Sequence, residues 1–366
     1  MLPEIGSNFW QYDLSKPRTE KLWWENSDYH IHWLKSGRNA MRAISNLLAD
    51  QRPLKEIVVP AYLCETEIDP WRENCWKISF YQINRNYEID FESLSRILKS
   101  KEPCVLLVQS YYGFDTITPD IAALLREAKQ HGWIIIEDLT HAIFTDYHLD
   151  FADYYTSSLR KFSAIPNGGI IVSKEDISSI RPKPEGNRTD ETALLAFRTK
   201  SSYFLSMNPE EKVQFRSLYS DLADLIGIDD QIYQISPLSY QIFGSLDISF
   251  IHGRRIENFN YLAKHINQSS FFELPLKRCS DPDCPLYLPV YFHSSTVRDE
   301  CRQYLSAHDI YCPIIWHKPL HHIIPYPVTE SIYDHILCFP IDQRYSVDEM
   351  QRIVDVLAQW EEGNEA

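Results

Sequence analysis

The sequence contains no hydrophobic run long enough to cross a membrane. Its longest apolar stretches, such as Val105–Val108 and Trp133–Ile136, are far shorter than the ~20 residues that a bilayer-spanning helix needs. The first residues, 1–17, also lack the basic start and apolar core of a secretory signal. We therefore expect a cytoplasmic protein that has no membrane partner.

Basic residues are scarce as well. There are 36 Lys and Arg against 51 Asp and Glu, which gives a formal net charge of −15 at pH 7. Proteins that bind DNA or RNA usually have an extended positively charged surface, so we expect no nucleic-acid partner. The net negative charge is still compatible with a local basic pocket for a small anion. The apolar content of 44% and charged content of 24% are those of an ordinary folded protein.

The eight cysteines form no CxxC pair; they are Cys64, Cys75, Cys104, Cys279, Cys284, Cys301, Cys312 and Cys338. Several lie inside apolar runs, where a cysteine usually acts as a small buried hydrophobe. We therefore expect reduced thiols in a cytoplasmic protein rather than a disulfide framework.

Metal-binding and common catalytic motifs are missing too. His317, His321 and His322 have a spacing that would suit a metal on a helix, but Pro319 lies inside this stretch and argues against a helix. No GxSxG, GxxxxGK[ST], HExxH or GxGxxG pattern occurs. We expect no metal site, and the usual hydrolase, NTPase, zinc-protease and dinucleotide-binding interpretations lack support.

The first half of the chain alternates helical and strand patterns. Residues 37–50 place Met41, Ile44 and Leu48 on one helical face. Asp90 and Thr118 are capping residues that begin two further helices. Predicted strands cover residues 57–60, 77–83, 104–109, 134–136, 154–156 and 169–173, and Asn167-Gly168 is a tight-turn signal between the last two. This alternation predicts an α/β fold with a mainly parallel sheet that is flanked by helices.

The second half predicts a smaller α/β unit. After a polar loop at residues 174–190, helical material covers 191–226. Further elements are expected as a helix at 239–266, a strand at 286–292, a helix at 297–308, a strand at 311–315 and a helix at 347–360. We therefore predict a large domain at residues 1–235, with the helical insertion 191–226, and a small C-terminal domain at 236–366.

Polar and aromatic residues follow the predicted strands of the first half. In an open parallel sheet, ligands bind beyond the carboxyl ends of the strands. The residues expected there are 60–63, 109–113, 137–141 and 158–161, together with 35–39 before the first helix.

These positions suit one cofactor. A phosphate suits the helix N-terminus near Gly37, an aromatic ring suits Tyr62, a basic ring nitrogen suits Asp138 and an aldehyde suits Lys161. Pyridoxal phosphate (PLP) has all four features. Each residue also has an ordinary structural explanation, because a lysine after a strand is usually a solvated charge and an aspartate there often caps a helix.

Six motifs occur in a familiar order: SGRNAM (36–41), VVPAYLC (58–64), YYGF (111–114), IIIEDLTHA (134–142), SLRKFSAIPNGGIIVS (158–173) and CPIIWHKP (312–319). In this order the chain resembles the fold-type I PLP-dependent aminotransferases, in particular the sugar aminotransferases of the DegT/DnrJ/EryC/StrS family. The resemblance implies a large PLP-binding domain with a smaller C-terminal α/β domain, and a homodimer.

The resemblance also implies roles for individual residues. Lys161 would form the Schiff base with the cofactor and later move a proton at the substrate Cα, and Asp138 would pair with the pyridine nitrogen. His141 would lie near the phenolic oxygen of the ring. The phosphate would be held by Ser158, Gly37, Arg38 and Asn39, and Tyr62 would stack on the ring.

The expected reaction is the transfer of an amino group to a keto acceptor. By the resemblance, the donor would be glutamate and the acceptor a nucleotide-linked keto-sugar. Two alternatives remain open at this stage: a PLP-dependent lyase or other Cα chemistry on an amino acid, and a non-catalytic binding or regulatory protein with this fold. Arg254, Arg255 and Asn258 are expected on the solvated face of a helix, although an arginine there could hold a substrate carboxylate in this kind of fold.

Overall fold

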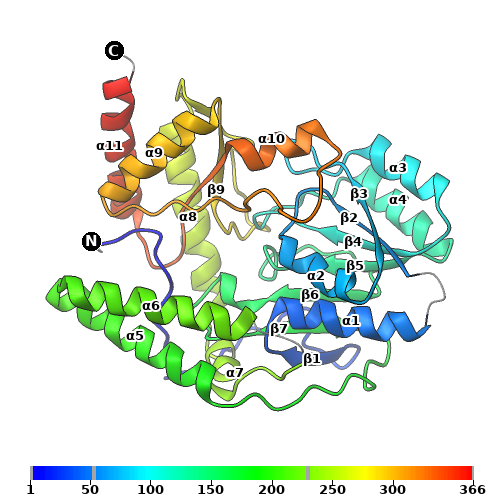
Figure 1. Ribbon diagram of the computed structural model, residues 1–366. Coiled ribbons are helices and arrows are strands. Elements are labelled where there is room, and N and C mark those ends of the chain that lie inside the picture. Colours follow the sequence, from blue (N-terminus) through cyan, green and yellow to red (C-terminus); the bar gives the residue numbers. More distant parts are fainter. Residues whose placement is uncertain (1–2, 52–54, 228–230, 365–366) are drawn as a thin grey trace.

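The computed structural model describes residues 3–51, 55–227 and 231–364 and is built around two β-sheets (Figure 1). The larger sheet has seven strands in the order β1-β7-β6-β5-β4-β2-β3. They are β1 (His30–Leu34), β2 (Glu56–Pro60), β3 (Lys77–Tyr81), β4 (Val105–Gln109), β5 (Ile134–Asp138), β6 (Tyr154–Ser158) and β7 (Gly169–Ser173). Strand β7 runs antiparallel to both of its neighbours, and the remaining pairs are parallel. The prediction of an α/β fold with a mainly parallel sheet is confirmed.

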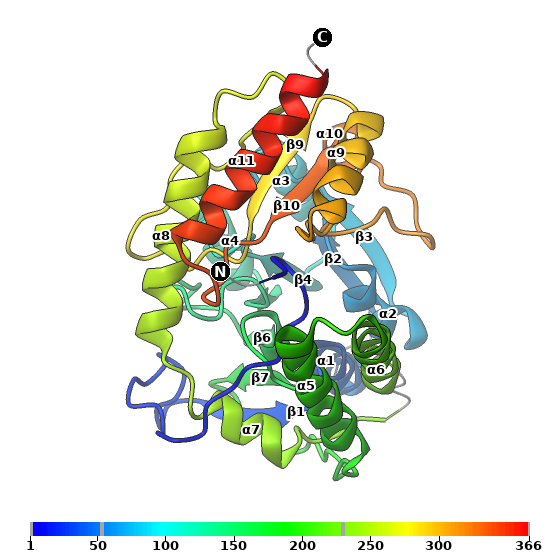
Figure 2. The same cartoon turned by 90° about the vertical axis from the view of Figure 1, so that its left-hand side faces the viewer.

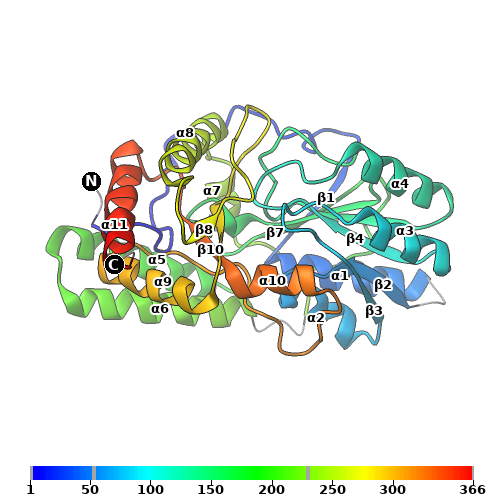
Figure 3. The ribbon, with the colours of Figure 1, turned by 90° about the horizontal axis from the view of Figure 1, so that it is seen from above.

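Helices cover both faces of this sheet. Alternate residues of β2 enter different hydrophobic clusters: Ile57 and Val59 pack on one face, and Val58 packs on the other. The first face is covered by α1 (Gly37–Gln51) and α2 (Glu65–Glu73), and the second by α3 (Phe91–Ser100) and α4 (Pro119–Gln130), as Figure 3 shows. Burial on both faces explains why the central strands are almost continuously apolar.

The capping residues act as expected. The Asp90 side chain accepts a hydrogen bond from the Ser93 backbone N–H at 2.8 Å, and that of Thr118 accepts one from Ile121 N–H at 3.4 Å. These bonds satisfy backbone donors that the first turn of a helix leaves unpaired. Helix α2 was not predicted from the sequence, because it is short and contains Pro70.

The C-terminal part carries the second sheet, in the order β10-β9-β8. Its strands are β8 (Phe272–Glu273), β9 (Leu288–Phe292) and β10 (Ile336–Phe339), and its helices are α8 (Ile248–Ile266), α9 (Ser295–Ala307), α10 (Pro327–His335) and α11 (Val347–Asn364). Figure 2 shows α8, α9 and α11 grouped around β9. The domain boundary at residue 235 remains a prediction.

The predicted helical insertion consists of two helices, α5 (Arg188–Ser206) and α6 (Pro209–Gly227). They lie side by side at the end of the molecule opposite α3 and α4 (Figures 1 and 3). None of the helices in the described ranges combines the length and apolarity that a membrane crossing requires.

Three local predictions are wrong. The expected helix at 239–266 is divided into α7 (Pro237–Phe243) and α8, because the chain turns at Gly244 before Asp247 caps the second helix. Residues 311–315 form no strand within the described chain, and β10 takes the place beside β9. Asn167-Gly168 does not join β6 to β7 by a tight turn: the paired strand ends are Ser158 and Gly169, so the loop 159–168 separates them.

Candidate functional site

The carboxyl ends of β5 and β6 and the start of α1 meet at a cavity of about 160 Å³. Five of the residues predicted from the sequence line it: Gly37, Arg38, Asp138, Ser158 and Lys161. The parallel arrangement of the central strands explains this convergence, because their carboxyl ends share one edge of the sheet.

One end of the cavity suits an anion. Helix α1 begins at Gly37, so its first backbone N–H groups and the positive end of its dipole lie there. Glycines make this approach possible: a Cβ on Gly169 would lie 2.2 Å from the backbone of Ser36, and a Cβ on Gly37 would lie 3.3 Å from the Cβ of Ser158. The turn before α1 therefore sits directly against β6 and β7.

Two arginines add positive charge at the same end. Arg38 donates from Nη1 to the carbonyl of Gly227 at 2.7 Å. Its Nε, and that of Arg160, are buried and have no hydrogen-bond partner in the described structure. Burial lowers the pKa of Arg160, and the nearby positive charge of Arg38 lowers it further. Two half-buried guanidinium groups, each with a buried Nε that has no partner among the described residues, are suited to a phosphate or carboxylate.

Lys161 ends a short 3₁₀ turn, η1 (Leu159–Lys161), directly after β6. Burial of its side chain lowers its pKa, and the nearby charge of Arg160 lowers it further. The Lys161 amine is therefore neutral in a larger fraction of molecules than the amine of a solvated lysine. The neutral amine is the form that acts as a nucleophile and a proton acceptor.

Two carboxyl groups lie in the same cavity. Asp138 ends β5 and is 2% exposed, and its Oδ1 accepts a hydrogen bond from the Thr140 backbone N–H at 2.6 Å. Glu67, from the first turn of α2, lines the cavity beside it. Burial raises the pKa of Glu67, and the charge of Asp138 raises it further.

His141 is fully buried behind the cavity rather than in its lining. Its Nδ1 accepts a hydrogen bond from the Tyr112 backbone N–H at 3.4 Å. Its ring stacks on that of Trp316, which does line the cavity, with the centroids 5.0 Å apart. Burial lowers the pKa of His141, so the neutral ring is favoured, and Nε2 has no hydrogen-bond partner among the residues described.

Like His141, two further predicted site residues lie outside the described lining of the cavity, Tyr62 and Asn39. The Tyr62 hydroxyl is hydrogen-bonded to that of Tyr112 at 2.8 Å, and its ring lies 5.2 Å from that of Trp316. Asn39 accepts a hydrogen bond from Tyr233 N–H at 2.7 Å and so fixes a neighbouring chain segment. Tyr62 thus contacts a lining residue, whereas Asn39 bonds to a segment that does not line the cavity.

Three lining residues, Ser36, Thr140 and Arg160, lie within the segments expected at the site but were given no role there. The lining residues outside those segments are Cys64, Thr66, Glu67, Ala223, Ile226, Gly227 and Trp316. Cys64 directly follows the first predicted strand end, and Thr66 and Glu67 lie close behind it, so local sequence could have suggested them. The α6 residues carry no such signal, because only the tertiary fold brings α6 to the cavity.

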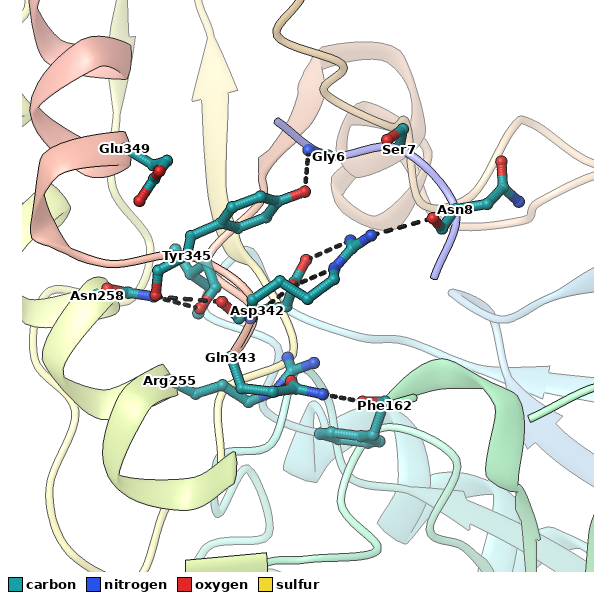
Figure 4. Close-up of polar contacts among 12 residues, drawn as sticks. Gly6, Ser7, Asn8, Phe162, Arg255, Asn258, Asp342, Gln343, Tyr345 and Glu349 are labelled. Atoms are coloured by element: carbon teal, nitrogen blue, oxygen red, sulfur yellow. Dashed lines mark hydrogen bonds and ion pairs between the residues drawn. The ribbon is translucent and has the colours of Figure 1, made fainter. Parts of the chain in front are cut away.

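A second cavity, of about 250 Å³, also reaches Arg160 and Lys161. Arg255 lines it and is fully buried, which corrects the expectation of a solvated helix face. Its Nε donates to Gln343 at 2.9 Å, while its Nη2 has no partner in the described part of the chain. The expectation failed because α8 packs this face, including the buried Asn258, against the segment that follows β10 (Figure 4).

The N-terminal residues 6–9 form part of the wall of the second cavity. Gly6 N–H donates to the Tyr345 hydroxyl at 2.7 Å, and the Asn8 carbonyl accepts from Arg344 at 3.0 Å (Figure 4). The N-terminal segment is thus held by the loop that precedes α11.

Comparison with known proteins bears on the fold. No protein-family model matches the chain, and no curated protein matches it in sequence. Among solved structures, it resembles PseC from Helicobacter pylori, an aminotransferase involved in the biosynthesis of pseudoaminic acid, with 14% identity, a TM-score of 0.66 and coverage of 91% of this chain and 87% of that one.

Two other structures are similar. One is a DegT DnrJ EryC1 StrS aminotransferase from Brucella abortus, with 15% identity, a TM-score of 0.61 and coverage of 91% and 86% of the two chains. The other is NtdA from Bacillus subtilis with bound cofactor PMP, with 14% identity, a TM-score of 0.61 and coverage of 90% and 73%. This chain has the aminotransferase fold. The resemblance inferred from the motifs is thereby confirmed at the level of the fold.

Proposed function

We propose that the cavity at the ends of β5 and β6 binds pyridoxal phosphate. The observation that carries the proposal is that Lys161, Asp138 and the N-terminus of α1 share one cavity. The unused polar atoms of Arg38, Arg160 and His141 around the cavity fit a polar cofactor, because buried polar groups in proteins normally have partners. A neighbouring structure that contains the cofactor PMP supports the assignment.

Each residue then has a chemical task. When bound, the cofactor supplies an aldehyde for amines and a ring that withdraws electrons from the substrate Cα. Lys161 would hold the cofactor and move a proton at that carbon, and Asp138 would keep the ring nitrogen protonated. Gly37, Arg38, Ser158 and Arg160 would bind the phosphate. His141 would position Trp316, on which its ring stacks, in the wall of the cavity. Tyr62 and Asn39 would position neighbouring chain segments through their hydrogen bonds.

We further propose an aminotransferase reaction. The family-like motifs support an amino-acid donor, for which we propose glutamate, and a nucleotide-linked keto-sugar as the acceptor. The same resemblance supports a homodimer. The eight cysteines are free thiols, which supports a reducing compartment such as the cytoplasm.

The test begins with absorption spectroscopy of the protein reconstituted with PLP. We expect a visible-range band that is absent in Lys161→Ala, because this substitution removes the only proposed covalent link. A missing band in the parent protein, or a band that persists in the variant, contradicts the proposal.

A second step tests the reaction. Adding an amino donor alone should convert the cofactor to its amino form, pyridoxamine phosphate, which chromatography of the released cofactor detects. Release of a keto product without pyridoxamine phosphate would instead identify the lyase alternative. Cofactor binding without conversion by any donor would favour a non-catalytic role.

A further inference from the structure

Residues 6–9 form a thin wall of the second cavity, and we call this segment the strap. The strap lines the second cavity, which also reaches Lys161. Gly6, Ser7 and Asn8 line a further hollow of about 190 Å³ as well. Asn8 is exposed, and the other three residues of the strap are half-buried. A single layer of chain therefore separates the space beside Lys161 from the surface.

The chain on either side of the strap is firmly fixed. Ile5 is fully buried, and its N–H donates to the Asp309 carbonyl at 2.9 Å. The carbonyl of Ile5 accepts from Tyr311 N–H at 2.8 Å. Trp10 is 3% exposed and packs in a hydrophobic cluster with residues of α5 and α6. The strap can therefore move while both of its ends stay in place.

The strap itself is held by side chains from two separate parts of the chain. Lys200 of α5 donates to the Ser7 hydroxyl at 2.9 Å and also to the Asn8 carbonyl. From the loop before α11, the Tyr345 hydroxyl accepts from Gly6 N–H at 2.7 Å (Figure 4). A few side-chain hydrogen bonds therefore keep the strap against the cavity, and each bond contributes only ~0.5–1.5 kcal/mol.

Lys200 is fully buried, although it holds a segment at the surface. Its Nζ lies 4.4 Å from the ring centroid of Trp10. A buried ammonium group loses its hydration, so its contacts have to compensate. The ring of Trp10 supplies a cation–π contact, and the strap supplies two oxygen acceptors. Lys200 itself lines neither cavity, so a substitution there alters the strap without changing a lining side chain.

The second cavity is the space that remains for a substrate. Lys161 and Arg160 line both cavities. When the cofactor occupies the first cavity, at the ends of β5 and β6, a molecule that reacts beside Lys161 still has the second cavity, of about 250 Å³. Pockets for drug-sized ligands usually measure ~300–1,000 Å³. A substrate as large as a nucleotide-linked sugar therefore needs more room than the closed strap leaves.

We propose that the strap is a movable wall that limits the size of the molecules that reach Lys161 through the second cavity. Small molecules enter while the strap is closed, and larger ones enter when it is displaced between its fixed ends. This inference rests on the proposed function of the first cavity. It gives a role to a segment that neither the motifs nor the comparisons single out.

The experiment compares four PLP-loaded proteins: the parent, Lys200→Met, Tyr345→Phe and the control Lys264→Met. Methionine fills the space of the lysine stem but donates no hydrogen bond, and phenylalanine keeps the ring of Tyr345 without its hydroxyl. Lys264 is an exposed residue of α8 that lines neither cavity. Each protein is treated with two carbonyl reagents, hydroxylamine and the bulkier O-benzylhydroxylamine. The loss of the visible band gives the rate at which each reagent reaches the cofactor.

We expect O-benzylhydroxylamine to react about tenfold faster with Lys200→Met, which loses two hydrogen bonds to the strap, and about fivefold faster with Tyr345→Phe, which loses one. Hydroxylamine should react at the same rate with all four proteins, because it is small enough to pass the closed strap. Equal acceleration of both reagents would show a general loosening of the fold and overturn the proposal. So would an unchanged rate for the bulky reagent in both strap variants.

Hydrogen–deuterium exchange of the cofactor-free proteins gives a readout that does not depend on the cofactor. Peptides that cover the strap should exchange faster in Lys200→Met and Tyr345→Phe than in the parent and in Lys264→Met. Equal exchange in all four proteins would contradict a movable strap. Failure of the proposed function gives a different result, because the parent would then show no visible band with PLP, whereas the exchange measurement would still decide whether the strap moves.

Discussion

Arg160 illustrates how a single side chain changes the character of the site. It follows β6 next to Lys161, lines both cavities and has an unused Nε. Together with Arg38 it places two guanidinium groups near the start of α1. The anion end of the cavity therefore combines a helix dipole with two full charges, which favours a dianionic group such as a phosphate.

Arg160→Gln should weaken PLP binding about tenfold to a hundredfold, because hydrogen bonds to charged groups contribute ~1.5–3 kcal/mol. Binding of pyridoxal, which has no phosphate, should hardly change. Titration calorimetry with both ligands measures the difference. The matched control is Arg254→Gln, because Arg254 is a half-buried arginine that pairs with Glu257 and lines neither cavity. Equal losses for the two ligands would contradict a phosphate contact.

At the scale of elements, the site depends on how closely α1 approaches β7. Gly169 begins β7 where the turn at Ser36 and Gly37 crosses it. Any side chain at residue 169 would overlap the backbone of that turn. Residue 169 must therefore be glycine because two backbone segments are in close contact there. This requirement does not depend on which ligand the cavity binds.

Gly169→Ala should displace the start of α1, lower the stability of the protein and weaken cofactor binding. The added Cβ would lie 2.2 Å from the Ser36 backbone, which cannot move without shifting the helix. Gly253→Ala is the control, because its Cβ would meet no atom within 4 Å and a helical alanine is favoured by ~1 kcal/mol over glycine. Urea unfolding and PLP titration of both variants measure the effects; an unimpaired Gly169→Ala protein would refute the packing argument.

At the scale of the whole molecule, buried carboxyl groups make the stability depend on pH. Glu137 lies at the centre of the large sheet and is 1% exposed. Its Oε2 accepts a hydrogen bond from Leu149 N–H at 2.8 Å, and burial raises its pKa to about 8. The folded protein thus keeps a proton at Glu137 that the unfolded chain releases near pH 4.5.

Between pH 4.5 and 8, this residue should lower the free energy of unfolding by ~1.4 kcal/mol for each pH unit of increase, because only the folded state still binds the proton. Glu137→Gln removes this contribution while its carbonyl can still accept from Leu149. Urea unfolding of both proteins at several pH values should show a stability difference that grows in favour of the variant as the pH rises. Parallel curves would disprove a protonated Glu137.

The sequence predicted the parts of the molecule that local pattern determines. The capping residues Asp90 and Thr118 begin helices as expected, and the strand ends bring Asp138, Ser158 and Lys161 to one cavity. The failures concern distant contacts. Arg255 looked like a surface residue because helical periodicity does not reveal a polar side chain that packs inward.

Contacts between distant parts of the chain also determine the pairing of β10 and the lining residues that the sequence did not predict. Strand β10 is short and pairs with β9, from which the helices α9 and α10 and the long loop between them separate it in sequence. Trp316 and the α6 residues line the cavity although they lie far along the chain from Asp138 and Lys161. No pattern within a short window of sequence contains that information.

The anchoring of the N-terminal segment has a practical consequence for protein production. Residues 6–9 are pinned beside the second cavity, so a bulky affinity tag joined upstream would emerge next to it. The carboxyl end of α11 instead projects from the body of the molecule (Figures 1 and 2). A purification handle belongs at that end, because no residue of α11 lines either cavity.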